Sequence, residues 1–108
     1  MEPQVVLDRD HLARYTMGDV VLEREVLGLF IGQMPVTVAS LRDSGDAVSW
    51  TRAAHTIKGS ARAVGAWRLA QLAEHAESCS SRHERWQALA DEIEIAVAEV
   101  HRHIAETV

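Results

Sequence analysis

The chain has 108 residues, 47% of them hydrophobic and 25% charged, which is the composition of one globular domain and excludes a disordered chain. Its 16 acidic residues outnumber its 11 lysines and arginines, and the net charge of −5 argues against nucleic acid as a partner, since phosphate binding needs a basic surface. The single cysteine, Cys79, excludes an internal disulfide and a multi-cysteine zinc site.

No segment has the features of a membrane span or of a secretory signal. No stretch approaches the roughly 20 uninterrupted apolar residues that a bilayer requires. The first residues, Met1 to Leu7, lack a basic start followed by an apolar run. We therefore expect a cytoplasmic chain with no membrane partner.

Apolar residues recur at helical spacing throughout the chain, and no alternating strand pattern with a turn dipeptide occurs, so an all-α fold is predicted. The predicted helices span residues 8–15, 19–43, 47–64, 66–78 and 82–105. Asp19 is positioned to cap the second helix and Gly65 to end the third. Pro35 lies inside the second helix, where it removes a hydrogen bond and clashes with the carbonyl of Ile31, so we expect a kink or a break there.

The arrangement of these helices follows from their short connections. Short turns force neighbouring helices to run antiparallel, and each of the four longer helices has its apolar residues on one side. We therefore predict a single domain over residues 1–108, an up-down antiparallel four-helix bundle with a short N-terminal helix. Val5, Val6 and that short helix are expected to cap one end of the core.

The third predicted helix has two distinct faces at about 100° per residue. The apolar arc, which we expect to face the core, contains Trp50, Ala54, Ile57, Ala61 and Val64. The opposite side contains Thr51, His55, Lys58, Gly59 and Arg62. A histidine is therefore expected to point outward from the middle of this helix.

Charge and a glycine distinguish the surroundings of His55. Lys58 is the only lysine in the chain, and residues 47–72 include four basic residues and no acidic one. Gly59 costs up to about 1 kcal/mol relative to alanine in a helix interior. One turn after His55, it leaves space beside the imidazole through which another molecule can approach.

These residue types suit the acceptance and onward transfer of a phosphoryl group. Unperturbed imidazole, with a pKa of about 6.5, is largely unprotonated near neutral pH, and its free nitrogen can attack phosphorus to form a labile phosphoramidate. Lys58 is suited to balancing the phosphoryl charge, with Arg62 helping from the rim. The chain has no glycine-rich phosphate loop and no nucleotide-binding motif. We therefore expect a phosphocarrier without autonomous kinase activity and without a cofactor or metal of its own.

Residues 54–61, Ala-His-Thr-Ile-Lys-Gly-Ser-Ala, followed by Val64 and Gly65, resemble the signature of histidine-containing phosphotransfer (HPt) domains, the relay modules of two-component signalling. The family pattern places a lysine three, a glycine four and commonly a glycine ten residues after the histidine. The resemblance extends over nearly the whole chain, because the family is a four-helix bundle of this length with a short first helix.

The resemblance implies a role for each of these residues. His55 would take a phosphoryl group from an aspartyl phosphate of one response-regulator receiver domain and pass it to another. Lys58 would neutralise the phosphate charge, and Gly59 would admit the active site of the receiver, which would hold Mg²⁺. A hybrid histidine kinase would be a further partner. In many members a polar residue, often Gln, on the following helix bonds the imidazole. The matching position here is Glu77, a departure that would raise the basicity of the imidazole, and Gln71 is a weaker alternative.

Receivers are expected to dock on the exposed side of the third helix and on adjoining apolar residues of the second, such as Met34 or Val36. We expect a transient interface of modest area, apolar near the glycine and polar at its rim. A receiver approaches a monomer most easily, so a monomer is expected.

Two other classes of function remain open at this point. The bundle could bind receivers or other helices without carrying phosphate, or it could be a helical metal protein, since His75 and Cys79 are four residues apart. His101 and His103 are two residues apart, cannot share one helical face, and are expected at a solvated helix end.

Overall fold

The computed structural model describes residues 6–107, and within them every regular element is a helix, as the composition and spacing predict. The helices are α1 (Arg9–Tyr15), α2 (Val20–Arg42), α3 (Ala47–Val64), α4 (Trp67–Ser78) and α5 (His83–Thr107). Each observed boundary lies within two residues of the predicted one. Val5, expected at one end of the core, lies outside the described residues.

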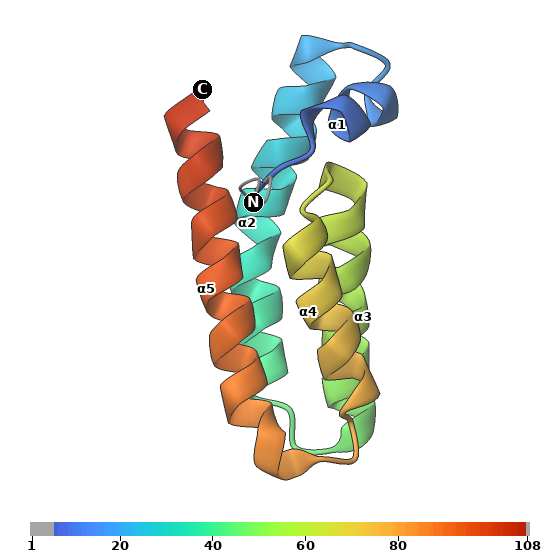
Figure 1. The fold of residues 1–108 in the computed structure, drawn as a ribbon, viewed down its shortest axis with the longest axis vertical. Coiled ribbons are helices and arrows are strands. Elements are labelled where there is room, and N and C mark those ends of the chain that lie inside the picture. The colour runs from blue at the N-terminus through green and yellow to red at the C-terminus, as the bar shows by residue number, and fades with distance from the viewer. Residues whose placement is uncertain (1–5, 108) are drawn as a thin grey trace, which may run out of the picture.

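The four longer helices form an antiparallel bundle, which confirms the predicted fold class. In Figure 1, α2 runs down the page, α3 returns up, α4 runs down and α5 returns up beside α2. The contacts between helices close a ring, since α2 touches α3, α3 touches α4, α4 touches α5, and α5 touches α2. Helix α3 therefore has α2 and α4 as its two neighbours in the bundle. Of its remaining surfaces, one faces the core and the other faces solvent.

Aspartates begin three of the helices, because an ionised carboxylate accepts hydrogen bonds from the otherwise unpaired N–H groups of the first turn. Asp8 caps α1, Asp19 caps α2 as predicted, and Asp46 caps α3. Gly65 ends α3 in the left-handed conformation at φ +81°, which is also the predicted end. Local chemistry thus fixes where α3 begins and ends.

Helix α2 continues through Pro35 without the break considered above. The proline costs about 3 kcal/mol in a helix interior. On both sides of it, Phe30, Met34 and Val38 are buried, and each fully buried apolar side chain stabilises the fold by about 1.5–3 kcal/mol. Packing of the continuous helix therefore outweighs the local penalty of Pro35.

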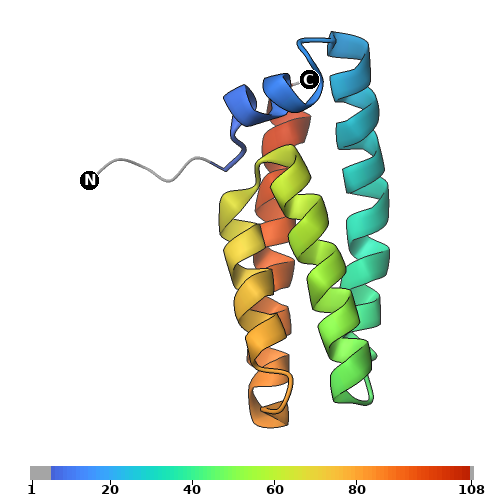
Figure 2. The same cartoon turned by 90° about the vertical axis from the view of Figure 1, so that its right-hand side faces the viewer.

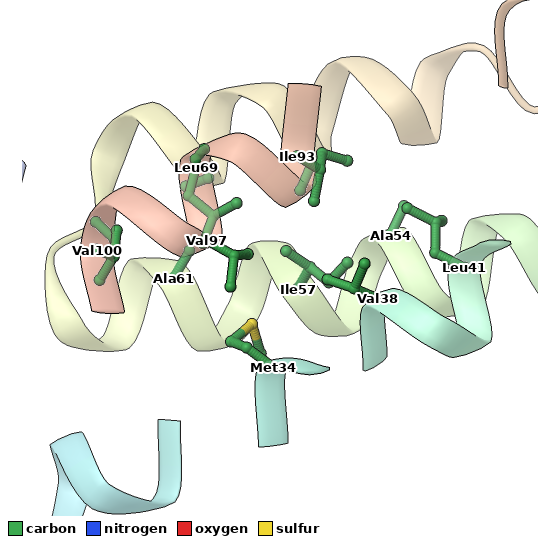
Figure 3. Close-up of a cluster of buried hydrophobic side chains, with 14 of the residues drawn as sticks. Met34, Val38, Leu41, Ala54, Ile57, Ala61, Leu69, Ile93, Val97 and Val100 are labelled. Atoms are coloured by element: carbon green, nitrogen blue, oxygen red, sulfur yellow. The ribbon is translucent and has the colours of Figure 1, made fainter. Parts of the chain in front are cut away.

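The core is a single apolar cluster that runs along the bundle axis. Figure 3 shows it between the helices, with these labelled side chains: Met34, Val38, Leu41, Ala54, Ile57, Ala61, Leu69, Ile93, Val97 and Val100. The buried residues that α3 and α4 contribute are mostly small, namely Ala53, Ala54, Ala61, Ala70, Ala73 and Ala76. Small side chains let two helix backbones approach closely, so side chains at the edge of the α3–α4 contact can meet.

The short helix α1 is attached to the turn between α3 and α4, at one end of the bundle (Figure 2). The backbone N–H of Asp8 donates to the carbonyl of Gly65 over 2.9 Å. The indole N–H of Trp67 donates to Asp8 Oδ2 over 2.9 Å, and the Trp67 ring meets the ring of His11 edge-on at 4.7 Å. Leu7 is buried and Val6 packs partly buried against the core, so this segment does cap one end of it.

Candidate functional site

The imidazole of His55 projects from the middle of α3 into solvent. The five residues expected on the inner arc of α3 are all buried. By contrast, the side chain of His55 is 68% exposed, in agreement with the predicted outward orientation. A second molecule can therefore reach the imidazole without any change in the core.

A carboxylate from the next helix bridges His55 and Lys58. Glu77 lies near the C-terminal end of α4, and its Oε1 is 2.9 Å from Nδ1 of His55. Its other oxygen, Oε2, accepts a hydrogen bond from Nζ of Lys58 over 2.6 Å. Of the two positions considered for a partner of the imidazole, the structure brings Glu77 to His55 and does not bring Gln71 there.

The charge of Glu77 fixes which imidazole nitrogen is free. The hydrogen bond from Lys58 lowers the pKa of Glu77, burial partly opposes this, and the hydrogen bond with His55 lowers it further. Glu77 is therefore ionised near neutral pH. An ionised carboxylate only accepts hydrogen bonds, so Nδ1 of His55 must carry the proton, and Nε2 is the nitrogen that has a free lone pair in the neutral ring.

Trp50 links α3 to α4 beside this site. Its buried indole N–H donates to the carbonyl of Ala76, the residue before Glu77, over 2.7 Å. Its ring stacks on Trp86 of α5, with ring centroids 4.5 Å apart and planes 3° from parallel. The sequence suggested only packing for Trp50. Its contact with α4 could have been anticipated, because a buried indole needs an acceptor for its N–H group.

The remaining predicted site residues have different surroundings. Gly59 is exposed, and a Cβ placed on it would meet nothing within 4 Å, so the surface one turn after His55 is open. Arg62 pairs with Glu74 of α4 over 3.5 Å and is not brought to His55. Glu74 and Gln71 line a separate hollow together with Arg62. Arg62 therefore does not contact the imidazole, and its expected help in balancing phosphoryl charge stays a prediction.

The positive charge expected around His55 is partly cancelled. No acidic residue lies between Ala47 and Leu72 in the sequence. However, α4 runs back along α3 and places Glu74 against Arg62 and Glu77 against Lys58. The side chain of Lys58 is only 15% exposed. The sequence alone could not reveal this, because these pairs join positions 12 and 19 residues apart through the packing of two helices.

Two of the hollows that adjoin α3 bear on the expected docking surface. One is lined by Ala47, Val48, Thr51, Arg52, His55, Thr56 and Glu77. The other lies between α2 and the C-terminal half of α3, with Val26, Leu29, Phe30 and Gln33 on its α2 side.

Met34, expected at a docking surface, is fully buried, because the helical period places it on the same side of α2 as Phe30. Val36 is 67% exposed and does not line either hollow, whereas Leu29 is 65% exposed and lines the second.

The other histidines give no metal centre within the described residues. No group of three or more His, Cys, Asp or Glu side chains between residues 6 and 107 is arranged to hold a metal ion. His75 Nε2 lies 3.9 Å from the sulfur of Cys79, without a third ligand of that kind.

The expectation of a solvated position is wrong for His101, whose ring packs edge-on against Phe30 and whose buried Nε2 is unpaired within the described chain. Burial lowers its pKa.

Comparison with known proteins agrees with this geometry. No described helix is both long enough and apolar enough to cross a bilayer. No curated protein and no solved structure matches the chain significantly. A family model, described as the Hpt domain, matches residues 25–103, which include α3, α4 and most of α2 and α5. The match covers most of the chain and includes His55 and its neighbours, so the chain belongs to the Hpt domain family.

Proposed function

We propose that this protein relays a phosphoryl group between aspartates of receiver domains through His55, as a phosphocarrier in a two-component phosphorelay. Family membership supports histidine phosphotransfer as the general activity. The observation that carries the assignment to His55 is its imidazole, 68% exposed, with Nδ1 held by an ionised carboxylate and Nε2 left for reaction. The partners are response-regulator receiver domains and a hybrid histidine kinase.

The transfer step needs no proton to leave His55. The lone pair of Nε2 attacks phosphorus, a P–N bond forms, and the P–O bond to the aspartate of the receiver breaks. The aspartate leaves as a carboxylate with the bonding electron pair. The ring keeps its proton on Nδ1 and becomes positively charged, and Glu77, 2.9 Å away, stabilises that charge. The reverse reaction returns the phosphoryl group to a second receiver by the same path.

The donor and the metal belong to the partner in this proposal. The sequence has no glycine-rich phosphate loop and no nucleotide-binding motif, so we propose that the chain does not phosphorylate itself from ATP. The receiver supplies both the aspartyl phosphate and the Mg²⁺ that its own site holds. His55 then has only to be presented at a surface that a receiver can cover.

Incubation with a radiolabelled, phosphorylated receiver domain tests this proposal. We expect label on the wild-type chain that is lost in acid and stable in alkali, as a phosphoramidate is. The variant His55→Gln should take up no label while its far-UV circular dichroism stays unchanged. His75→Gln, which changes another exposed histidine on the adjacent helix, should be labelled like the wild type.

Two results would overturn the proposal. One is label that persists in the His55→Gln variant, which would place the acceptor elsewhere. The other is a chain that binds phosphorylated receivers without ever becoming labelled. The second result would identify the bundle as an interaction module that carries no phosphate.

A further inference from the structure

The direction of the His55 side chain indicates where a phosphoryl group on its Nε2 atom would lie on the surface of α3. Side chains in a helix lean toward its N-terminus. A group on Nε2 of His55 therefore lies over the preceding turn, which carries Thr51 and Arg52. The hollow that adjoins His55 includes both residues among its walls, together with Thr56 and Glu77, whereas Lys58 and Gly59 are not part of it.

The lysine of the family pattern already has a partner in this chain. Nζ of Lys58 donates to Glu77 over 2.6 Å, and its side chain is mostly buried. Moving Lys58 to a phosphoryl group would leave the carboxylate of Glu77 without its cation, beside a new anion. A phosphoryl group brings roughly 1.5–2 negative charges, so a cation other than Lys58 is needed beside it.

Arg52 lines the hollow beside His55, and also a neighbouring hollow between α2 and α3. Its side chain is exposed and makes no hydrogen bond or ion pair within residues 6–107. Hydrogen bonds from Ser49 lower the pKa of Asp46, and the charge of Arg52 adds a smaller contribution. The hydroxyl of Thr51 is likewise without a hydrogen-bond partner in the described chain. A guanidinium can donate two parallel hydrogen bonds to phosphate oxygens, and a hydroxyl can add a third.

We propose that Arg52 and Thr51 bind the phosphoryl group on Nε2 of His55, and that Lys58 instead positions Glu77. This assignment rests on the proposed phosphotransfer through His55 and names the groups that contact the transferred phosphoryl. Arg52 and Thr51 offset the charge on the phosphoryl oxygens while the P–N bond forms. The family pattern includes neither residue, because it lists only positions after the histidine, although helical spacing already placed Thr51 on the same face as His55.

Two donors separate contact with phosphate from contact with a receiver. Phosphoramidate, a small donor, has no protein surface; its P–N bond breaks and ammonia leaves with the proton that its own nitrogen carries. Arg52→Ala should slow labelling of His55 by phosphoramidate and by a phosphorylated receiver alike, by about 10- to 100-fold. Arg52→Lys should recover part of the rate, and Thr51→Val should reduce it by a smaller factor. Arg24→Ala, at another exposed arginine, should leave both rates unchanged.

The outcomes also separate this proposal from the proposed function. Equal labelling of Arg52→Ala and wild type by phosphoramidate would overturn the role of Arg52, even if transfer from the receiver slowed, because the arginine would then only dock the receiver. Failure of phosphoramidate to label wild-type His55 would overturn it as well. Labelling by phosphoramidate that depends on Arg52, with no transfer from any receiver, would support the phosphoryl contact and refute the relay.

Discussion

Replacement of Gly65 by alanine tests the attachment of α1 to the bundle. Gly65 has φ +81°, and a left-handed residue with a Cβ costs about 1–2 kcal/mol. That Cβ would lie 2.9 Å from both Cβ and the carbonyl oxygen of Asp8. Relief requires Asp8 to move, which loses the hydrogen bond from its N–H to Gly65, worth about 1 kcal/mol. The sum predicts a loss of about 2–3 kcal/mol in the free energy of unfolding.

Urea unfolding followed by far-UV circular dichroism measures this loss, and the melting temperature should fall by roughly 10 °C or more. Gly28→Ala is the matched control, because Gly28 lies inside α2 and a Cβ there meets nothing within 4 Å. The control should be more stable than the wild type by about 0.5–1 kcal/mol. Transfer to His55, about 15 Å away along α3, should persist in Gly65→Ala below its melting temperature. If both substitutions changed stability in the same direction, neither the left-handed backbone nor the contact with Asp8 would explain why position 65 is a glycine.

Two predictions concern the site itself. Gly59→Leu should keep or increase stability by up to about 1 kcal/mol, because the helix gains a better helix former in open space. It should nevertheless slow transfer from a receiver about tenfold or more, whereas the control Gly28→Leu should leave transfer unchanged. Equal transfer rates in the two variants would refute the role of the gap beside His55. Glu77→Gln should be less stable than the wild type near neutral pH. Because the pKa of Glu77 is lowered from 4.5 in the folded chain, its stabilising contribution is present above pH 4.5 and is lost as the pH falls through the lower folded value. Urea midpoints of the two proteins should therefore converge in acid, and a gap that stays constant down to pH 2–3 would contradict the ion pair with Lys58.

The helices and their faces could be predicted because they depend on local spacing. The inner arc of α3, the aspartate cap of α2 and the glycine at the end of α3 all follow from residues within a few positions of one another. Of the kink or break expected at Pro35, the break does not occur, because burial along the whole of α2 outweighs the local penalty of the proline. Met34 was wrongly expected at the surface although the period of α2 turns it inward.

The contacts of the site were harder to predict because they join two helices. The family pattern indicated Glu77 as a partner of His55, but the sequence did not show that its second oxygen binds Lys58. That contact depends on small alanines between α3 and α4 and on the hydrogen bond from Trp50 to Ala76. Neither feature has a fixed sequence distance from the histidine. The packing of His101 against Phe30 likewise joins two different helices, so local spacing did not predict it.

The bridging position of Glu77 makes the reactivity of the histidine a property of the folded protein. A peptide of residues 47–64 would retain the imidazole and the ammonium group but would lack the carboxylate that orients one and holds the other. In an unfolded chain the imidazole would lack its hydrogen bond with Glu77. In the proposed relay, phosphoryl transfer would therefore depend on the docking of α3 against α4.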